Sequence, residues 1–92
     1  MIHINPEDWA VLRSILDKFQ HEYYAYGSRA KGTHRKFSDL DMCIMGPISD
    51  LDMFYLKEAF EESDLPFKVD VRRWTDMSKD FQAIIQGDLV PL

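Results

Sequence analysis

Segments of helical periodicity alternate with short strand-like segments along the whole chain, and this alternation constrains the fold more than any other feature of the sequence. Helices and strands that alternate bury their apolar faces by stacking the helices on one sheet. The pattern therefore predicts an α/β or α+β fold in which a small β-sheet is covered by helices, and it leaves open whether the sheet is parallel or mixed. The expected order is a helix to about residue 20, a strand over 23–26, a basic loop over 27–38 with one helical turn after Ser28, a strand over 39–45, a helix to about residue 63, a strand over 67–74 and a helix over about 75–86.

Residues with known capping preferences mark the helix ends. Asn5 followed by Pro6 predicts the start of the first helix, because Asn caps helices and Pro is accepted in their first turn. Ser49, with Asp52 three residues later, resembles a capping box for the middle helix. Gly87 stands where a C-terminal cap glycine of the last helix is expected.

Size and composition predict one domain over residues 1–92, with 46% hydrophobic residues to build its core. A chain of 92 residues has no room for a second domain that would hold a substrate, so we expect a partner protein.

The single cysteine, Cys43, excludes an intramolecular disulfide and is expected to be a buried thiol. No N-terminal signal and no apolar run as long as a membrane span is recognisable, so we expect a cytoplasmic protein without a membrane partner.

The charge is acidic overall but contains one basic island. The formal net charge of −5 argues against a stable nucleic-acid-binding protein or a membrane-surface protein. Within this acidic chain, a stretch of eight residues carries four cations and no acid: Arg29, Lys31, Arg35 and Lys36. Such an island suits a compact polyanion such as a triphosphate, and a solvated loop is the alternative.

Two acids, Asp39 and Asp41, are candidate metal ligands. They are separated by one residue on an expected strand, so both carboxylates point to one face with Cβ atoms about 7 Å apart, while Leu40 points into the core. Two acids aimed at one point repel each other unless a cation lies between them. Oxygen ligands of this kind suit Mg²⁺, with Mn²⁺ as a second possibility. The alternative is an ordinary acidic pair of the sort found in turns.

A third acid, Asp70, lies on the last expected strand. Phe67, Val69 and Val71 alternate on one face of that strand, which leaves Asp70 on the other face with Lys68. An acid between two valines is unusual because Asp has a low strand propensity. If the two strands are neighbours, Asp70 joins Asp39 and Asp41 in a three-carboxylate site. Otherwise it is a solvent-facing strand residue.

The dipeptide Gly27-Ser28 is a candidate phosphate-binding turn. A glycine between a strand and a helical turn permits close backbone approach to a ligand, and Ser28 adds a hydroxyl donor. Taken alone, the dipeptide is more typical of an ordinary turn that ends a strand.

Together these residues resemble the DNA polymerase β-like nucleotidyltransferase superfamily. The shared pattern is Gly27-Ser28, a ten-residue spacer, Asp39-Leu40-Asp41, and the later strand acid Asp70. The short chain is similar to its minimal nucleotidyltransferase (MNT) group, many members of which are paired with a small helical HEPN-type toxin and act as the antitoxin. The resemblance implies a mixed sheet, two Mg²⁺ ions held by the three aspartates, and ATP as donor of AMP to a hydroxyl acceptor such as a toxin tyrosine. It also implies that Gly27 and Ser28, with Arg29 and Lys31 beside them, bind the nucleotide.

The expected activity is therefore metal-dependent nucleotidyl transfer from ATP, with Asp39, Asp41 and Asp70 as catalytic residues. Two alternatives remain at this point: a non-catalytic antitoxin that occludes its toxin, and a nucleotidyltransferase for small molecules of the aminoglycoside type. Aromatic residues in excess of what a small core needs give weak support for a protein interface. The candidates are Trp9, Tyr23, Tyr24, Tyr55 and Trp74, of which Trp9 is expected in the core.

Overall fold

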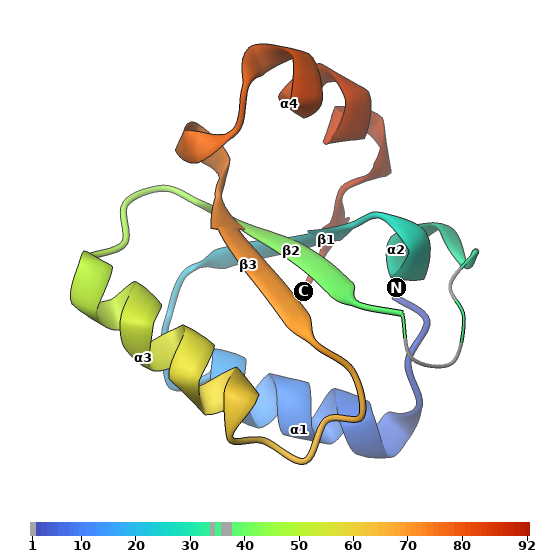
Figure 1. Cartoon of the computed structure of the whole chain (residues 1–92), viewed down its shortest axis with the longest axis vertical. Helices are drawn as coiled ribbons and strands as arrows, with labels where there is room; N and C mark the ends of the chain where they lie inside the picture. Colours follow the sequence, from blue (N-terminus) through green and yellow to red (C-terminus); the bar gives the residue numbers. More distant parts are fainter. Residues whose placement is uncertain (1, 34, 36–37) are drawn as a thin grey trace.

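The computed structural model describes residues 2–33, 35 and 38–92 and contains one four-stranded sheet with helices on both faces (Figure 1). In chain order the elements are α1 (Pro6–Leu16), β1 (Glu22–Tyr26), α2 (Ser28–Lys31), β2 (Leu40–Met45), α3 (Asp50–Glu61), β3 (Val69–Arg73), the 3-10 turn η1 (Trp74–Asp76), α4 (Lys79–Ile85), the 3-10 turn η2 (Gln86–Asp88) and β4 (Val90–Pro91). Within the described residues, none of the helices is both long and apolar enough to cross a bilayer.

The sheet is mixed, with the strand order β3-β2-β1-β4. β1 runs antiparallel to β2 and to β4, whereas β2 and β3 are parallel. Parallel neighbours need a crossover, and α3 provides it. The register places Asp41 of β2 directly beside Asp70 of β3. The α+β class and the mixed sheet are thus confirmed.

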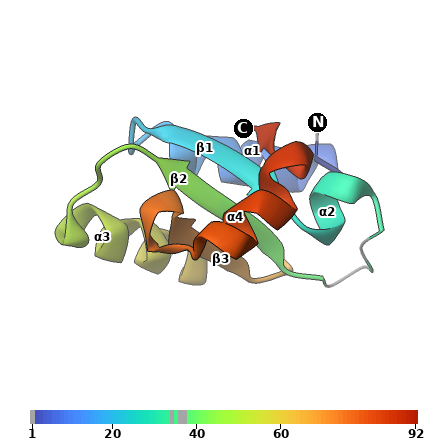
Figure 2. The ribbon, with the colours of Figure 1, turned by 90° about the horizontal axis from the view of Figure 1, so that it is seen from above.

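The two faces of the sheet are covered differently. α1 and α3 lie against one face, and α4 lies over the other (Figure 2). On the first face, Leu40, Met42 and Ile44 of β2 are completely or almost completely buried against Leu12 and Leu56 of the helices. The second face has a smaller apolar cluster of Tyr26, Cys43, Met77 and Ile85. Burial of one large apolar side chain contributes about 1.5–3 kcal/mol, so the first face carries most of the stabilising burial.

Side-chain caps explain where the longer helices begin. Asn5 Oδ1 accepts a hydrogen bond from the Asp8 amide at 2.8 Å, and Ser49 Oγ accepts one from the Asp52 amide at 3.0 Å. Both are the caps that the sequence predicts. Each satisfies an amide that has no partner within the helix.

The last helix begins later than the sequence predicts. η1 occupies the residues where the helix was expected to start, and Ser78 is the actual cap, accepting from the Phe81 amide at 3.1 Å. Gly87 lies within η2 and does not have the positive φ of a C-terminal cap glycine. Ile84, an apolar residue of this helix, is 71% exposed.

Other differences are smaller. α1 ends at Leu16, four residues before the expected Gln20, and β3 is shorter at both ends than the expected 67–74. The two-residue strand β4 was not predicted. It extends the sheet because the Leu92 amide donates to the Tyr23 carbonyl at 3.0 Å, next to the pairing of Ala25 with Val90.

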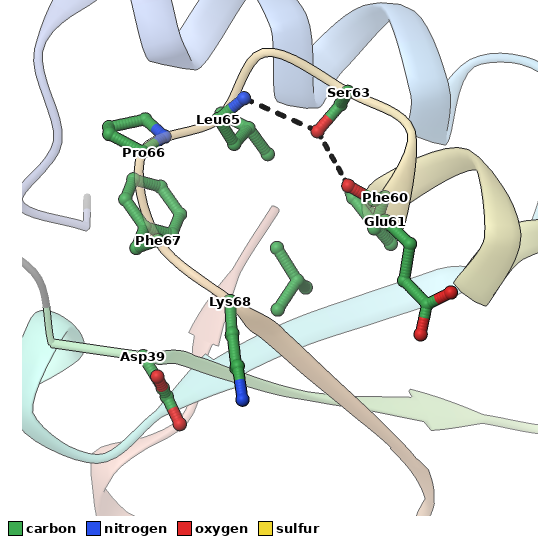
Figure 3. Close-up of a pocket in the computed structure, with 9 residues that line it drawn as sticks. Asp39, Phe60, Glu61, Ser63, Leu65, Pro66, Phe67 and Lys68 are labelled. Carbon is green, nitrogen blue, oxygen red and sulfur yellow. Dashed lines mark hydrogen bonds between the residues drawn. The ribbon is translucent and has the colours of Figure 1, made fainter.

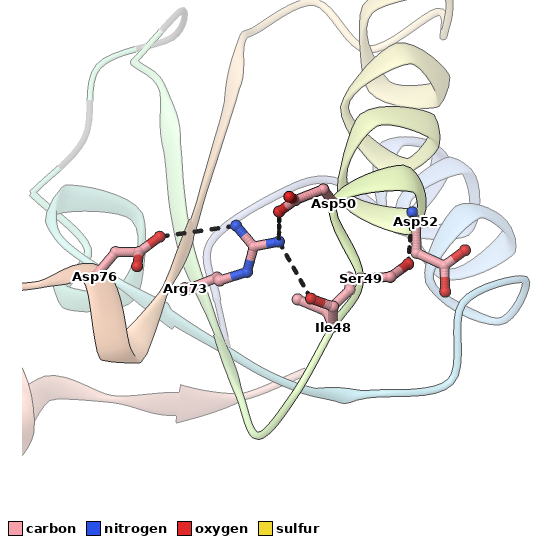
Figure 4. Close-up of polar contacts among 6 residues, drawn as sticks. All are labelled: Ile48, Ser49, Asp50, Asp52, Arg73 and Asp76. Carbon is pink, nitrogen blue, oxygen red and sulfur yellow. Dashed lines mark hydrogen bonds and ion pairs between the residues drawn. The ribbon is translucent and has the colours of Figure 1, made fainter.

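Arg73, at the end of β3, connects three elements (Figure 4). Its Nη2 donates to the Ile48 carbonyl at 3.1 Å and to Asp50 Oδ1 at 2.8 Å, and its Nη1 lies 3.8 Å from Asp76 Oδ2. The guanidinium therefore fixes the start of α3 and the turn η1 relative to the sheet.

Candidate active site

The face of the sheet beneath α4 carries the three predicted acids. Asp41 is half-buried in β2, and Asp70 lies beside it in β3. Asp39 is exposed and immediately precedes β2, where Leu40 already points into the opposite core. Because side chains alternate along a strand, this arrangement brings Asp39 and Asp41 to the same face as Asp70.

Asp70 and Asp39 lie close enough to Asp41 to affect its ionisation. Burial raises the pKa of Asp41 above its ordinary value, and the negative charges of Asp70 and Asp39 raise it further, against a smaller opposing effect of Arg72. Burial, followed by the charge of Asp41, raises the pKa of Tyr26 to about 12. An excess of negative charge therefore accumulates at this point of the surface.

Arg72 balances part of that charge. Its Nε lies 3.3 Å from Asp70 Oδ2, and its guanidinium carbon lies 6.0 Å from the ring centroid of Phe81 in α4. Both charged side chains are about half exposed, so the pair contributes little to stability. The pair matters more for the orientation of Asp70, because the guanidinium of Arg72 attracts the Asp70 carboxylate.

The donor set suits a hard divalent cation. In the side-chain positions of the described residues, no three His, Cys, Asp or Glu groups already converge on a single metal position. However, Asp39 is exposed and Asp70 is half exposed, so both have room to turn toward Asp41. The donors are all carboxylates, and their repulsion is relieved by a cation between them, which fits Mg²⁺.

The turn after β1 lies against Asp41. Tyr26, the last residue of β1, pairs with Asp41 in the antiparallel ladder, and Gly27 follows with φ +77° and ψ −156°. That conformation is essentially limited to glycine. A Cβ atom at Gly27 would lie only 2.6 Å from Asp41 Oδ2. Glycine is therefore required here by the backbone and by the carboxylate, and Ser28 begins α2 directly beside the acids.

Arg29 does not occupy the position expected of a phosphate ligand. It is 3% exposed, its Nε donates to the Ser38 carbonyl at 2.9 Å, and its Nη1 donates to the His3 carbonyl at 3.1 Å. Its guanidinium carbon also lies 4.0 Å from the centroid of the Phe67 ring. This placement is at odds with the expected phosphate contact, because the side chain connects the N-terminal segment with the loop before β2.

The remaining cations of the basic island differ from Arg29. Lys31 is half exposed, and its Nζ lies 3.2 Å from Asp88 Oδ2 in η2. Arg35 is exposed. Lys36 lies outside the described residues. Of the two cations predicted to bind the nucleotide, Arg29 is buried, whereas the ammonium group of Lys31 is accessible to an anion.

A cleft of about 710 Å³ opens beside Asp39 (Figure 3). Its polar rim includes Lys68, whose carbonyl accepts from the Leu40 amide at 2.9 Å and which therefore neighbours Asp39 across the two strands. The other lining residues come from the end of α3 and the loop that follows: Phe60, Glu61, Ser63, Leu65, Pro66, Phe67 and Val69. The sequence placed Lys68 on the face of Asp70 but gave no indication of the cleft, which depends on how that loop folds back.

The nucleotidyltransferase domain model matches residues 10–90, a range that includes the acids, the glycine turn and the whole sheet except Pro91 of β4. The chain belongs to the nucleotidyltransferase domain family. A curated relative from Haemophilus influenzae, named as a probable protein adenylyltransferase MntA, is 43% identical over 89 residues, covering 92% of this chain and 78% of that protein. The resemblance to the minimal nucleotidyltransferase group is thereby confirmed, and this nucleotidyltransferase is an enzyme of that type.

A crystal structure of a putative nucleotidyltransferase from Sulfolobus solfataricus is also similar to this one. The TM-score is 0.49 at 18% identity, over 89% of this chain and 72% of that one. The family assignment rests on the two sequence matches.

Proposed function

We propose that this nucleotidyltransferase transfers AMP from ATP, with Mg²⁺, to a hydroxyl group of a partner protein, a HEPN-type toxin that it inhibits as antitoxin. The observation that carries the proposal is the packing of the Gly27 turn against Asp41, with Asp39 and Asp70 beside it. This places a candidate phosphate turn and three carboxylates within one small area. The name of the 43% identical relative, a probable protein adenylyltransferase, supports AMP and a protein acceptor.

In the proposed reaction, the acceptor oxygen attacks the α-phosphorus of ATP. The bond from that phosphorus to the oxygen bridging to the β-phosphate breaks, and pyrophosphate leaves with the electron pair. The hydroxyl proton passes to the carboxylate of Asp70. This side chain is about half exposed, and its Oδ2 lies 3.3 Å from Arg72 Nε. The products are an AMP ester of the acceptor and pyrophosphate.

Three groups of residues have separate tasks in this reaction. Asp39, Asp41 and Asp70 would hold Mg²⁺, which supplies charge neutralisation for the triphosphate when bound. The Gly27 turn and the Ser28 hydroxyl would bind phosphate oxygens, with Lys31 as the accessible cation. Arg29 would not touch the nucleotide, because its side chain connects the N-terminal segment with the loop before β2 through the His3 and Ser38 carbonyls. Because ATP is the donor, we place the reaction in the cytoplasm.

The test combines nucleotide binding with transfer. Calorimetry with ATP and Mg²⁺ should give binding that needs the metal and is lost in Asp39→Asn/Asp41→Asn. Co-expression with the protein encoded beside this gene, followed by intact-mass measurement, should show one or more added AMP units on that protein. Asp80→Asn, which changes an exposed acid in α4, is the matched control and should transfer normally.

The possible failures separate the parts of the proposal. If the double variant binds ATP as well as the unmodified protein, the three-acid site is wrong. If the neighbour binds but gains no mass with ATP and Mg²⁺, transfer to it is wrong and inhibition by occlusion replaces it.

A further inference from the structure

The outer face of α3 exposes three large apolar side chains in one patch. Leu51 is 60% exposed, Phe54 59% and Tyr55 47%, and these are positions i, i+3 and i+4 of one helix. The rings of Phe54 and Tyr55 contact each other edge to face, with centroids 5.7 Å apart. The opposite face of α3 already supplies the core through its buried residues, so the outer patch has no packing role within the fold. We call these three residues the α3 patch.

A contiguous patch differs from a single exposed residue. Scattered apolar residues are common on protein surfaces, whereas adjacent aromatic and aliphatic residues on a rigid element are typical of binding sites. The α4 residue Ile84 is even more exposed, but it is the only large apolar residue exposed on its helix. It therefore provides an internal comparison for the α3 patch.

The surroundings of the patch are strongly acidic. Residues 50–64 contain six acids and one lysine. Glu58 and Glu62 follow the patch along the same outer face, with Glu61 beside them, and none of the three forms an ion pair within the described part of the chain. An apolar patch that continues into unpaired acids is complementary to a surface that combines apolar and basic side chains.

The α3 patch is held rigidly. Ser49 caps the helix and Arg73 binds Asp50 at its first turn (Figure 4), and Leu56 of the same helix is completely buried. A partner that binds here pays little ordering cost on this side of the interface.

The same helix leads to the candidate active site. Phe60 and Glu61, in the last turn of α3, line the cleft that opens beside Asp39 (Figure 3). The cleft beside Asp39 therefore begins at the C-terminal end of the same helix that carries the α3 patch in its first turns.

We propose that the outer face of α3 is the docking surface for the protein acceptor, and that the acceptor binds it with an apolar surface that also carries Lys or Arg. The proposal rests on the proposed transfer to a protein and names the surface that recognises it. A second copy of this chain is a poorer occupant, because two such faces would bring unpaired acids together with only Lys57 to compensate on each.

The test measures the affinity for the protein encoded beside this gene, with two matched variants. Leu51→Ser/Phe54→Ser/Tyr55→Ser should weaken binding at least about 100-fold, since central aromatic anchors dominate protein interfaces. Ile84→Ser should leave affinity within about threefold, as expected for a residue outside the interface. In a second pair, Glu58→Lys/Glu62→Lys should slow association at low salt, while Asp80→Lys on α4 should not.

ATP affinity with Mg²⁺, measured on the triple variant, shows whether the fold and the active site remain intact. Normal ATP binding together with lost partner binding supports the proposal. If the triple variant binds the neighbour as tightly as the Ile84→Ser control, or if self-association is what the triple variant abolishes, the docking surface is wrong although transfer stands. If the neighbour is neither bound nor modified by the unmodified protein, the proposed function fails together with the surface.

Discussion

The two faces of the sheet divide stability and chemistry between them. Toward α1 and α3, β2 presents Leu40, Met42 and Ile44, all completely or almost completely buried. Toward α4, the same strand presents Asp41, whose pKa is raised by burial and by neighbouring acids. Consecutive residues of one strand thus have opposite effects on folding. The apolar face has to stabilise the fold sufficiently to hold repelling carboxylates together on the other.

The largest effect should come from a truncation on the apolar face. Leu40 is 0% exposed, so Leu40→Ala removes transfer free energy and leaves a cavity, and should lower the free energy of unfolding by about 2–5 kcal/mol. Urea unfolding measures it. The matched control is Leu51→Ala, which makes the same change at a 60% exposed position and should alter stability by less than about 0.5 kcal/mol. Similar losses in both variants would contradict the assignment of the core to this face.

Substitution of Arg29 tests whether this buried cation contributes to stability or to nucleotide binding. Arg29→Met removes hydrogen bonds to two carbonyls and should lower the free energy of unfolding by about 1.5–3 kcal/mol. Lys31→Met changes an exposed ion pair and should cost less than about 1 kcal/mol. The same calorimetry with ATP and Mg²⁺ should show a greater loss of affinity for Lys31→Met than for Arg29→Met. The reverse ranking of affinities would restore Arg29 as a phosphate ligand.

Alanine substitutions at the two glycines that follow β1 and β2 distinguish the cost of a positive φ from the cost of a steric contact with Asp41. Gly27 and Gly46 have nearly the same φ, +77° and +78°, but a Cβ at Gly46 would contact nothing within 4 Å. Gly46→Ala should cost about 1–2 kcal/mol, which is the penalty of a positive φ for a side chain. Gly27→Ala should cost more and should also displace Asp41, so that Mg²⁺-dependent ATP binding is lost. Equal effects of the two changes on stability and on ATP binding would show that the contact with Asp41 is unimportant.

The smallest expected effect is that of Asp41→Asn, which should stabilise the metal-free protein, whereas the preceding substitutions destabilise it. Because the folded-state pKa of Asp41 is raised above its ordinary value of 3.8, the folded protein retains this proton to a higher pH than the unfolded chain does. Stability from this group is therefore full below pH 3.8 and is lost as pH rises through the folded-state pKa. Asp41→Asn should then stabilise the metal-free protein at neutral pH by less than about 1 kcal/mol, as for other partly exposed charges.

Thermal unfolding of the metal-free protein at neutral pH and near pH 3 measures this gain, which should vanish at the lower pH. Asp80→Asn, an exposed control, should show no such pH-dependent gain. A loss of stability at neutral pH in Asp41→Asn would mean that the carboxylate is satisfied by its surroundings.

The sequence predicted the elements that local chemistry specifies. The caps at Asn5 and Ser49 are made by side chains a few residues away from the amides they satisfy, and both were found correctly. The parallel pairing that brings Asp70 to Asp41 could not be obtained from periodicity, and the family resemblance implied only that the sheet is mixed. The three acids and the glycine turn were candidates from strand alternation and turn chemistry, the resemblance joined them into one site, and their roles as ligands stay predictions.

The sequence was least informative where contacts between distant parts of the chain determine the structure. Arg29 belongs to a basic island by sequence, but Phe67, far along the chain, provides the aromatic surface that keeps it buried. β4 contains only two residues, one of them proline, so no strand pattern could mark it. Among the aromatics suggested for an interface, Tyr55 is exposed and Tyr23 is buried, and Phe54, which is also exposed, was not among them.

The parallel pairing of β2 with β3 also determines when, during synthesis, the three acids can meet. A ribosome makes Asp39 and Asp41 before any of α3, and Asp70 follows only after the whole crossover. A fragment that stops within α3 contains the glycine turn and two of the acids but has no neighbour on the outer side of β2. Prematurely terminated chains therefore cannot assemble the three-acid arrangement, which forms only after the crossover has been translated and has closed onto the sheet.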